Sequence, residues 1–156
     1  MSNLLEQRCD AVFVVSGAPR GKDLDIPGRH DTNRIHIGID WLESVAFGHI
    51  DSIGERVLII GVGNTAMDCC RSSCRLGGKD IKVMARRPRG FFNASSLELD
   101  DAEEDDVALI VNHAPHTFGL EHGQLKGMAF EHLYWGSGAH TSRTTAPNTI
   151  PTAVVT

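Results

Sequence analysis

The chain has 156 residues, of which 41% are hydrophobic and 22% are charged, a composition typical of one soluble globular domain with a sizeable core. Its formal net charge of −5 argues against nucleic-acid binding, which needs a broad basic surface. No apolar run approaches the roughly 18 residues of a membrane span, and the first residues lack the long apolar core of a signal peptide. We therefore expect a cytoplasmic protein that contacts neither nucleic acid nor a membrane.

The first predicted element is a strand over residues 10–15, an apolar run of the buried type that leads into a turn of small residues at 16–19. Residues 20–38 are rich in Gly, Pro, Asp and Arg and follow no steady period, which predicts a connection. No dinucleotide fingerprint accompanies the strand. We therefore expect it to belong to a different sheet from the strands that follow.

A short helix is predicted over residues 41–47, with Asp40 as its N-cap and Gly48 beyond its end. Residues 56–60 are an apolar run rich in β-branched side chains, typical of a strand that is buried on both faces.

A glycine turn that opens a helix follows at once. It has the pattern G-x-G-x-x-A and comprises Gly61, Val62, Gly63, Asn64, Thr65 and Ala66. The first glycine permits a sharp turn, the second lets the backbone approach a pyrophosphate, and Ala66 permits close packing of helix on strand. Free N–H groups and the positive end of a helix would point out of this turn, so a dinucleotide is the ligand that fits.

The helix after the turn is amphipathic and is predicted to end at Gly77-Gly78. Residues 81–85 then form a second strand, which completes a βαβ unit of about thirty residues, the length that the fingerprint requires. Three of the four cysteines, Cys69, Cys70 and Cys74, share the helix; none forms a C-x-x-C motif, and we interpret them as small buried hydrophobes.

The residues after the second strand distinguish NADPH from NADH. An NAD site places Asp or Glu here to bind the ribose 2′-OH, whereas this chain has Arg86 and Arg87, with Arg89 after a proline. Guanidinium groups bind a 2′-phosphate through charge-assisted hydrogen bonds. The sequence therefore predicts NADPH; the alternative is a solvated basic loop.

The next segment is acidic. Residues 90–93 are predicted to form a loop, and Ser95 with Glu98 forms a capping box for a short helix that reaches about Glu104. We interpret the carboxylates at 100–106 as a solvated face, because the run lacks the glycine and the terminal glutamate of a calcium loop. The eight histidines are scattered, and no metal site is predicted.

Residues 107–111 are the next predicted strand, and a hairpin is predicted from 116 to 135, with its turn around 119–123 and a second arm over 125–133. The segment 136–156 is small and polar, and we expect little order there except around residues 153–155. The predicted fold is thus an α/β Rossmann-like domain, with a central parallel sheet, flanking helices and an antiparallel hairpin.

Several strings of this chain resemble the small (β) subunit of NADPH-dependent glutamate synthase and its relatives, flavoproteins that are built like the pyridine nucleotide-disulfide oxidoreductases. The resemblance covers residues 10 to about 133 and is carried by residues 10–18, 25–28, 61–68 and Arg86-Arg87. Within 61–68 the string G-x-G-N-x-A-x-D adds Asp68 to the residues that the resemblance assigns to the cofactor site. The loop after the arginines departs from the family, which often has Glu-Met-Pro-Ala there.

The resemblance implies an NADPH domain inserted into an FAD domain, hydride transfer from NADPH to FAD, and onward transfer of single electrons to iron–sulfur centres. It divides this chain into a remnant of the FAD domain (1–48), an NADPH-binding domain (49–135) and a tail (136–156). The FAD fingerprint and the cluster cysteines are absent from the sequence, so the rest of the FAD domain or a partner subunit would supply them. The chain is expected to bind NADPH and to be inactive alone.

Three alternatives remain. A non-catalytic NADPH sensor would have the same fingerprint, since fold and cofactor binding do not define function. A short-chain dehydrogenase needs a Tyr-x-x-x-Lys pair, but Gly138 stands four residues after Tyr134, the single tyrosine. A methyltransferase also favours an acidic residue where Arg86 stands. An unpaired strand edge around residues 12–15 would favour a homo-oligomer.

Overall fold

The structure is a computed structural model that describes residues 11, 13, 17, 20–135, 140–144 and 153–155. Of the buried strand predicted over 10–15, Ala11 and Phe13 are described; neither lies in a strand and both are exposed, Phe13 to 92%. The other residues of that prediction lie outside the described ones.

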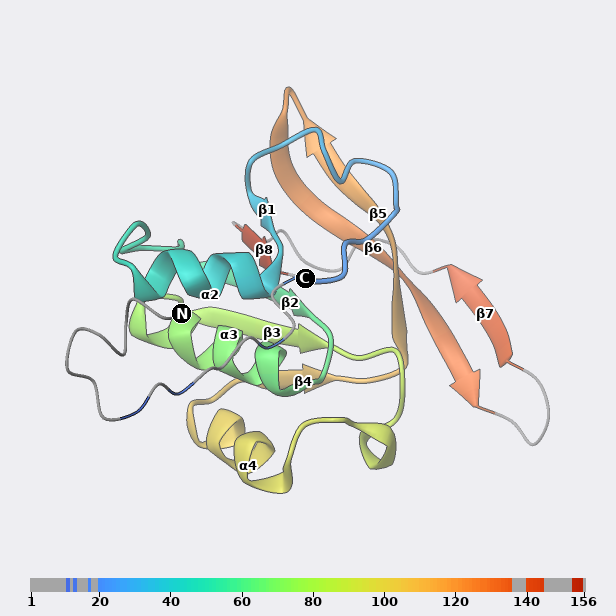
Figure 1. Ribbon diagram of the computed structural model, residues 1–156. Coiled ribbons are helices and arrows are strands. Elements are labelled where there is room, and N and C mark those ends of the chain that lie inside the picture. Colours follow the sequence, from blue (N-terminus) through green and yellow to red (C-terminus); the bar gives the residue numbers. More distant parts are fainter. Residues whose placement is uncertain are drawn as a thin grey trace.

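A five-stranded parallel sheet forms the centre of the molecule, in the order β1-β8-β2-β3-β4 (Figure 1). Its strands are β1 (Ile35–His36), β2 (Arg56–Ile60), β3 (Asp80–Met84), β4 (Ala108–Ile110) and β8 (Ala153–Val155). A second, antiparallel sheet has the order β5-β6-β7 and consists of β5 (His113–Glu121), β6 (Gln124–Trp135) and β7 (His140–Thr144).

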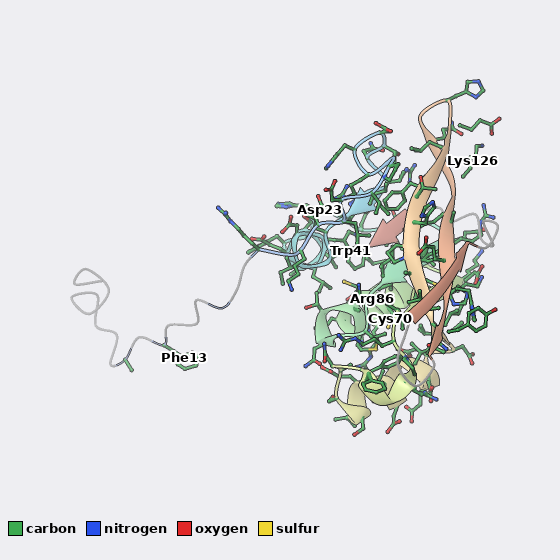
Figure 2. The ribbon with its side chains drawn as sticks, turned by 90° about the vertical axis from the view of Figure 1, so that its right-hand side faces the viewer. Phe13, Asp23, Trp41, Cys70, Arg86 and Lys126 are labelled. Atoms are coloured by element: carbon green, nitrogen blue, oxygen red, sulfur yellow. The ribbon has the colours of Figure 1, made fainter. Side chains whose placement is uncertain are left out.

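The two faces of the central sheet carry different layers (Figures 1 and 2). One face is covered by helices α2 (Gly38–Ala46) and α3 (Asn64–Arg75), and α4 (Ser96–Glu104) packs beside α3. The long hairpin β5-β6 covers the other face. The predicted architecture, a parallel sheet with flanking helices and an antiparallel hairpin, is confirmed.

Strand β2 shows how the sequence specifies these layers. Val57 and Ile59 lie in the apolar cluster that includes Met67 of α3, whereas Leu58, on the opposite face, lies in the cluster that includes Phe130 of β6. Successive side chains of a strand point to opposite faces, so a continuous apolar run is what burial on both faces requires. The prediction of a strand buried on both faces is confirmed.

The start of α2 differs from the prediction. The helix begins at Gly38, its N-cap is Ile37, and no side chain caps it. Asp40 is therefore not the N-cap but lies within the first turn, where its carboxylate still faces the positive end of the helix. The C-terminal prediction is confirmed, because Gly48 follows the helix with a φ of +72°.

Two predicted local motifs are present. Ser95 and Glu98 form the complete capping box of α4, and Gly77 ends the turn after α3 with a φ of +93°. The hairpin turn is tighter than predicted: His122 and Gly123 alone connect the strands, both with positive φ. Consecutive residues of positive φ form the two-residue turn whose twist suits a hairpin.

Some elements lie across the predicted domain boundaries. The central sheet includes β1, which precedes residue 49, and α2 packs against α3. The segment 136–156, for which the sequence predicts little order, contributes β7 and β8, and β8 lies between β1 and β2. The other residues of that segment lie outside the described ones.

Candidate functional site

The glycine turn joins the carboxyl end of β2 to α3. Gly61 has a φ of +124°, which favours glycine, and its N–H donates to the carbonyl of Met84 at 3.1 Å. Gly63 is the N-cap of α3, and no side chain caps the helix. The N–H of Ala66 donates to the carbonyl of Gly63 at 2.9 Å, whereas no backbone acceptor among the described residues binds the N–H groups of Asn64 and Thr65. These two are left for another acceptor, as a helix N-terminus that binds a phosphate requires.

The loop after the arginines is hydrogen-bonded to this turn. The carbonyl of Val62 accepts hydrogen bonds from the N–H groups of Asn93 at 3.2 Å and Ala94 at 3.1 Å. Val62 itself packs against the apolar cluster under α3. Asn93 and Ala94, in the loop where the sequence departs from the family pattern, thus help to fix the conformation of the turn.

Arg86 and Arg87 follow strand β3, the neighbour of the strand that leads into the turn. Strands β2 and β3 are parallel neighbours, with Ile60 opposite Met84. Ala85 extends β3 by one residue, because its N–H donates to Ile110 O at 2.7 Å and its carbonyl accepts from His113 N at 2.9 Å. The arginines follow immediately.

The guanidinium groups of Arg86 and Arg87 are available to a ligand. Both side chains are exposed, and neither has a hydrogen bond or an ion pair among the described residues. Arg89 differs, because it forms an ion pair with Glu103 of α4.

A pocket of about 360 Å³ opens at the glycine turn. The turn lines it through Gly61, Gly63, Thr65 and Ala66. The rest of the lining comes from residues 20–24, the start of α2 at Gly38 and Ile39, and the side chains of Ile60 and Cys69. The pocket lies at the carboxyl ends of parallel strands, next to the strand order reversal, where open α/β sheets bind ligands.

Not every predicted cofactor residue lines this pocket. Val62, Asn64 and Asp68 are outside the lining, and Asp68 is exposed on α3. Arg86 and Arg87 stand at the tip of the neighbouring strand, also outside it. Residues 20–24 were missed by sequence reasoning, because they lack any period or motif; their two basic side chains were the available signal.

The cysteines of α3 are not reactive groups. Burial, with smaller contributions from the carboxylate of Asp68 and the neighbouring Cys70, raises the pKa of the Cys69 thiol to about 12. Burial likewise raises the pKa of Cys70 to about 12. A thiol of this kind stays protonated at neutral pH, so Cys69 supplies an apolar wall to the pocket and not a nucleophile.

Among the described residues, no group of three or more His, Cys, Asp or Glu side chains is placed to hold a metal ion. In that same part of the chain, no helix has the length and apolar character needed to cross a membrane.

The parallel sheet, its flanking helices and the glycine turn between β2 and α3 define an α/β protein of the Rossmann type. The chain matches the family model of the pyridine nucleotide-disulphide oxidoreductases over residues 2–133. It belongs to this family.

Similar proteins include the β subunit of NADPH-Fe(3+) oxidoreductase from Geobacter sulfurreducens, 35% identical over 105 residues, which are 66% of this chain and 16% of that protein. The small chain of glutamate synthase [NADPH] from Azospirillum brasilense is 31% identical over 126 residues, 73% of this chain and 26% of that protein. The resemblance to the glutamate synthase small subunit is thereby confirmed.

The fold has solved relatives. Thioredoxin reductase from T. acidophilum matches 87% of this chain and 40% of its own, with a TM-score of 0.61 and 13% identity. Thioredoxin reductase from Lactococcus lactis matches 87% of this chain and 41% of its own, with a TM-score of 0.63 and 16% identity. The chain thus spans less than half the length of each of these four relatives.

Proposed function

We propose that this chain binds NADPH and orients it for hydride transfer to a flavin, FAD, that is held by the rest of a longer protein or by a partner subunit. Electrons would then pass to iron–sulfur centres outside this chain. The observation that carries the proposal is the uncapped glycine turn beside Arg86 and Arg87, which follow the neighbouring strand and have no ion pair among the described residues. Relatives named as NADPH-dependent oxidoreductases add support.

The residues present fit the diphosphate of NADPH. A Cβ added to Gly63 would meet no atom within 4 Å, and the φ of Gly63 is −104°, which any residue adopts. Neither crowding nor backbone strain within the chain thus accounts for a glycine here. A ligand that approaches the backbone closely does account for it, because a methyl group would occupy the place of a phosphate oxygen.

The residues present do not fit the other two groups. The sequence contains a single G-x-G-x-x-A turn, which leaves no second fingerprint for FAD. The cysteines at 69, 70 and 74 lie along α3, and two of their thiols are buried and protonated, which is unlike a cluster site.

NADPH supplies the hydride, and the chain supplies binding and orientation. The N–H groups at the start of α3 would bind the diphosphate, and Arg86 with Arg87 would bind the 2′-phosphate. No acid or base is required of the protein in a direct hydride transfer. Without the FAD half, we expect the chain to bind NADPH but not to reduce a dye.

The test compares NADPH with NADH in fluorescence titrations of the native chain and of Arg86→Ala and Arg87→Ala. A lost charge-assisted hydrogen bond is worth about 1.5–3 kcal/mol, so each variant should weaken NADPH binding by about tenfold or more while NADH binding stays unchanged. Arg75→Ala, at the far end of α3, is the matched control and should change neither. If the variants weakened both nucleotides equally, the assignment of the arginines would be wrong.

A further inference from the structure

Residues 20–24 line the pocket together with the glycine turn. We call this segment the strap. It contributes two basic side chains, Arg20 and Lys22, to a cavity whose other lining is backbone or apolar apart from Asp23 and Thr65. A role for these two side chains in nucleotide binding rests on the proposed function.

The strap is held in place on both sides of Lys22. Gly21 lies so close to the loop before α2 that an added Cβ would overlap Ile37 and come within 3.1 Å of Ile39. On the other side, Leu24 packs against the apolar cluster under the β5-β6 hairpin. The backbone that carries Lys22 is thus fixed by its neighbours.

The carboxylate of Asp23 in the strap already has partners within the chain. Asp23 forms an ion pair with Arg29, a largely buried side chain whose guanidinium also donates to the carbonyl of Ile35 at 3.3 Å. Asp23 also accepts the N–H of Leu24 at 2.8 Å. Arg20 and Lys22, in contrast, are exposed and have no ion pair among the described residues. The charge that the strap offers to a ligand is therefore positive.

The strap and the arginine pair lie on opposite sides of the glycine turn. In the sheet, β3 and its Arg86 lie to one side of β2, whereas the strap contacts Ile37 and Ile39, which follow β1 on the other side. Figure 2 shows Asp23 of the strap well separated from Arg86. A dinucleotide whose 2′-phosphate is at Arg86 and whose diphosphate is at the turn would extend its nicotinamide half under the strap.

We propose that Lys22, assisted by Arg20, binds the phosphate on the nicotinamide side of the dinucleotide. The chain would then hold NADPH at three points: the arginine pair at the 2′-phosphate, the glycine turn at the adenosine-side phosphate of the diphosphate, and the strap at its nicotinamide-side phosphate. An ammonium group suits this role, because it acts as a point charge that approaches a phosphate from several directions.

The test titrates the full chain and its Lys22→Ala variant with two ligands. NADPH contains both halves, whereas 2′,5′-ADP contains only the adenosine half that faces Arg86. Lys22→Ala should weaken NADPH binding by about tenfold, the value of one charge-assisted contact, and leave 2′,5′-ADP binding within about twofold. Arg20→Ala should act in the same direction.

Two further variants separate a specific contact from a general charge effect. Lys22→Arg keeps the charge and should retain NADPH affinity, whereas Lys126→Ala removes a lysine on the distant hairpin and should change nothing (Figure 2). Circular dichroism and thermal unfolding of each variant should match the native chain, because Lys22 is exposed.

The proposal is overturned if Lys22→Ala binds NADPH as Lys126→Ala does, or if it weakens 2′,5′-ADP as much as NADPH. Both outcomes leave the proposed function intact as long as the native chain binds NADPH and Arg86→Ala weakens that binding. If the native chain fails to bind NADPH, the proposed function fails, and the role of the strap fails with it.

Discussion

The two glycines of the turn are predicted to respond differently to substitution by alanine. Gly63 has an ordinary φ of −104° and open space around a built Cβ, so the lower entropy of the unfolded chain should offset the poorer N-cap preference of alanine, and Gly63→Ala should change the free energy of unfolding by less than about 0.5 kcal/mol. Gly61 has a φ of +124°. Gly61→Ala should therefore cost about 1–2 kcal/mol of stability.

Although Gly63→Ala is expected to be the more stable of the two variants, it should weaken nucleotide binding. A phosphate oxygen must come within about 2.7–3.2 Å of a backbone nitrogen to accept its hydrogen bond, and Gly63 lines the pocket where that oxygen would lie. The methyl group of Gly63→Ala should push the phosphate away and weaken NADPH binding by at least about tenfold, or 1.4 kcal/mol. Gly63→Ala is thus expected to be stable but defective in binding.

Urea unfolding and NADPH fluorescence titration of the same preparations provide the assay. Gly90→Ala is the matched control, because Gly90 also has open space around a built Cβ but lies outside the pocket lining; it should change neither quantity appreciably. Unaltered NADPH affinity in Gly63→Ala would refute the reasoning. A loss of stability in Gly63→Ala as large as that in Gly61→Ala would refute it as well.

Three other predictions concern stability. Ser95→Ala removes the capping box of α4 and should lower the free energy of unfolding by about 1 kcal/mol in urea titrations. Gly28→Ala should cost about 2–4 kcal/mol, because Gly28 has a φ of +85° and a Cβ there would lie 2.9 Å from both Phe118 Cβ and Leu120 Cδ1; an unchanged denaturation midpoint would contradict this packing. The pKa of Cys69 rises from 9.0 in a solvated thiol to about 12 on folding, because of burial, so the folded state retains the proton longer; this contribution is complete below pH 9 and is lost as pH rises toward 12. Stability should fall more steeply over that range in the native chain than in Cys69→Ala, and equal slopes would refute the assignment.

The sequence predicts this fold best where one residue type has one physical explanation. The apolar run of β2, the glycines at 61 and 77, and the Ser95–Glu98 box each satisfy a local requirement that is visible without tertiary contacts, and all are found as predicted. The adjacency of the turn and the arginines also follows, because a βαβ unit brings the carboxyl ends of its two strands together.

The features that were missed depend on tertiary contacts. Asp40 is of a residue type that favours the N-cap, yet α2 begins two residues before it, at Gly38, which is buried. The strap has no periodicity, so its position in the pocket lining is determined by the close approach of Gly21 to Ile37 and by the Asp23–Arg29 ion pair. Such long-range packing overrides local propensity.

The position of β8 has a consequence for any shortened version of this protein. Val154 pairs with Ile35 on one side and with Leu58 on the other, so three late residues join β1 to the rest of the sheet. A truncation before residue 153 would leave β1 without a neighbour and would open one edge of β2 to solvent along its length. Residues 20–135 would therefore be a poor choice of recombinant fragment, although they include every residue assigned to the nucleotide.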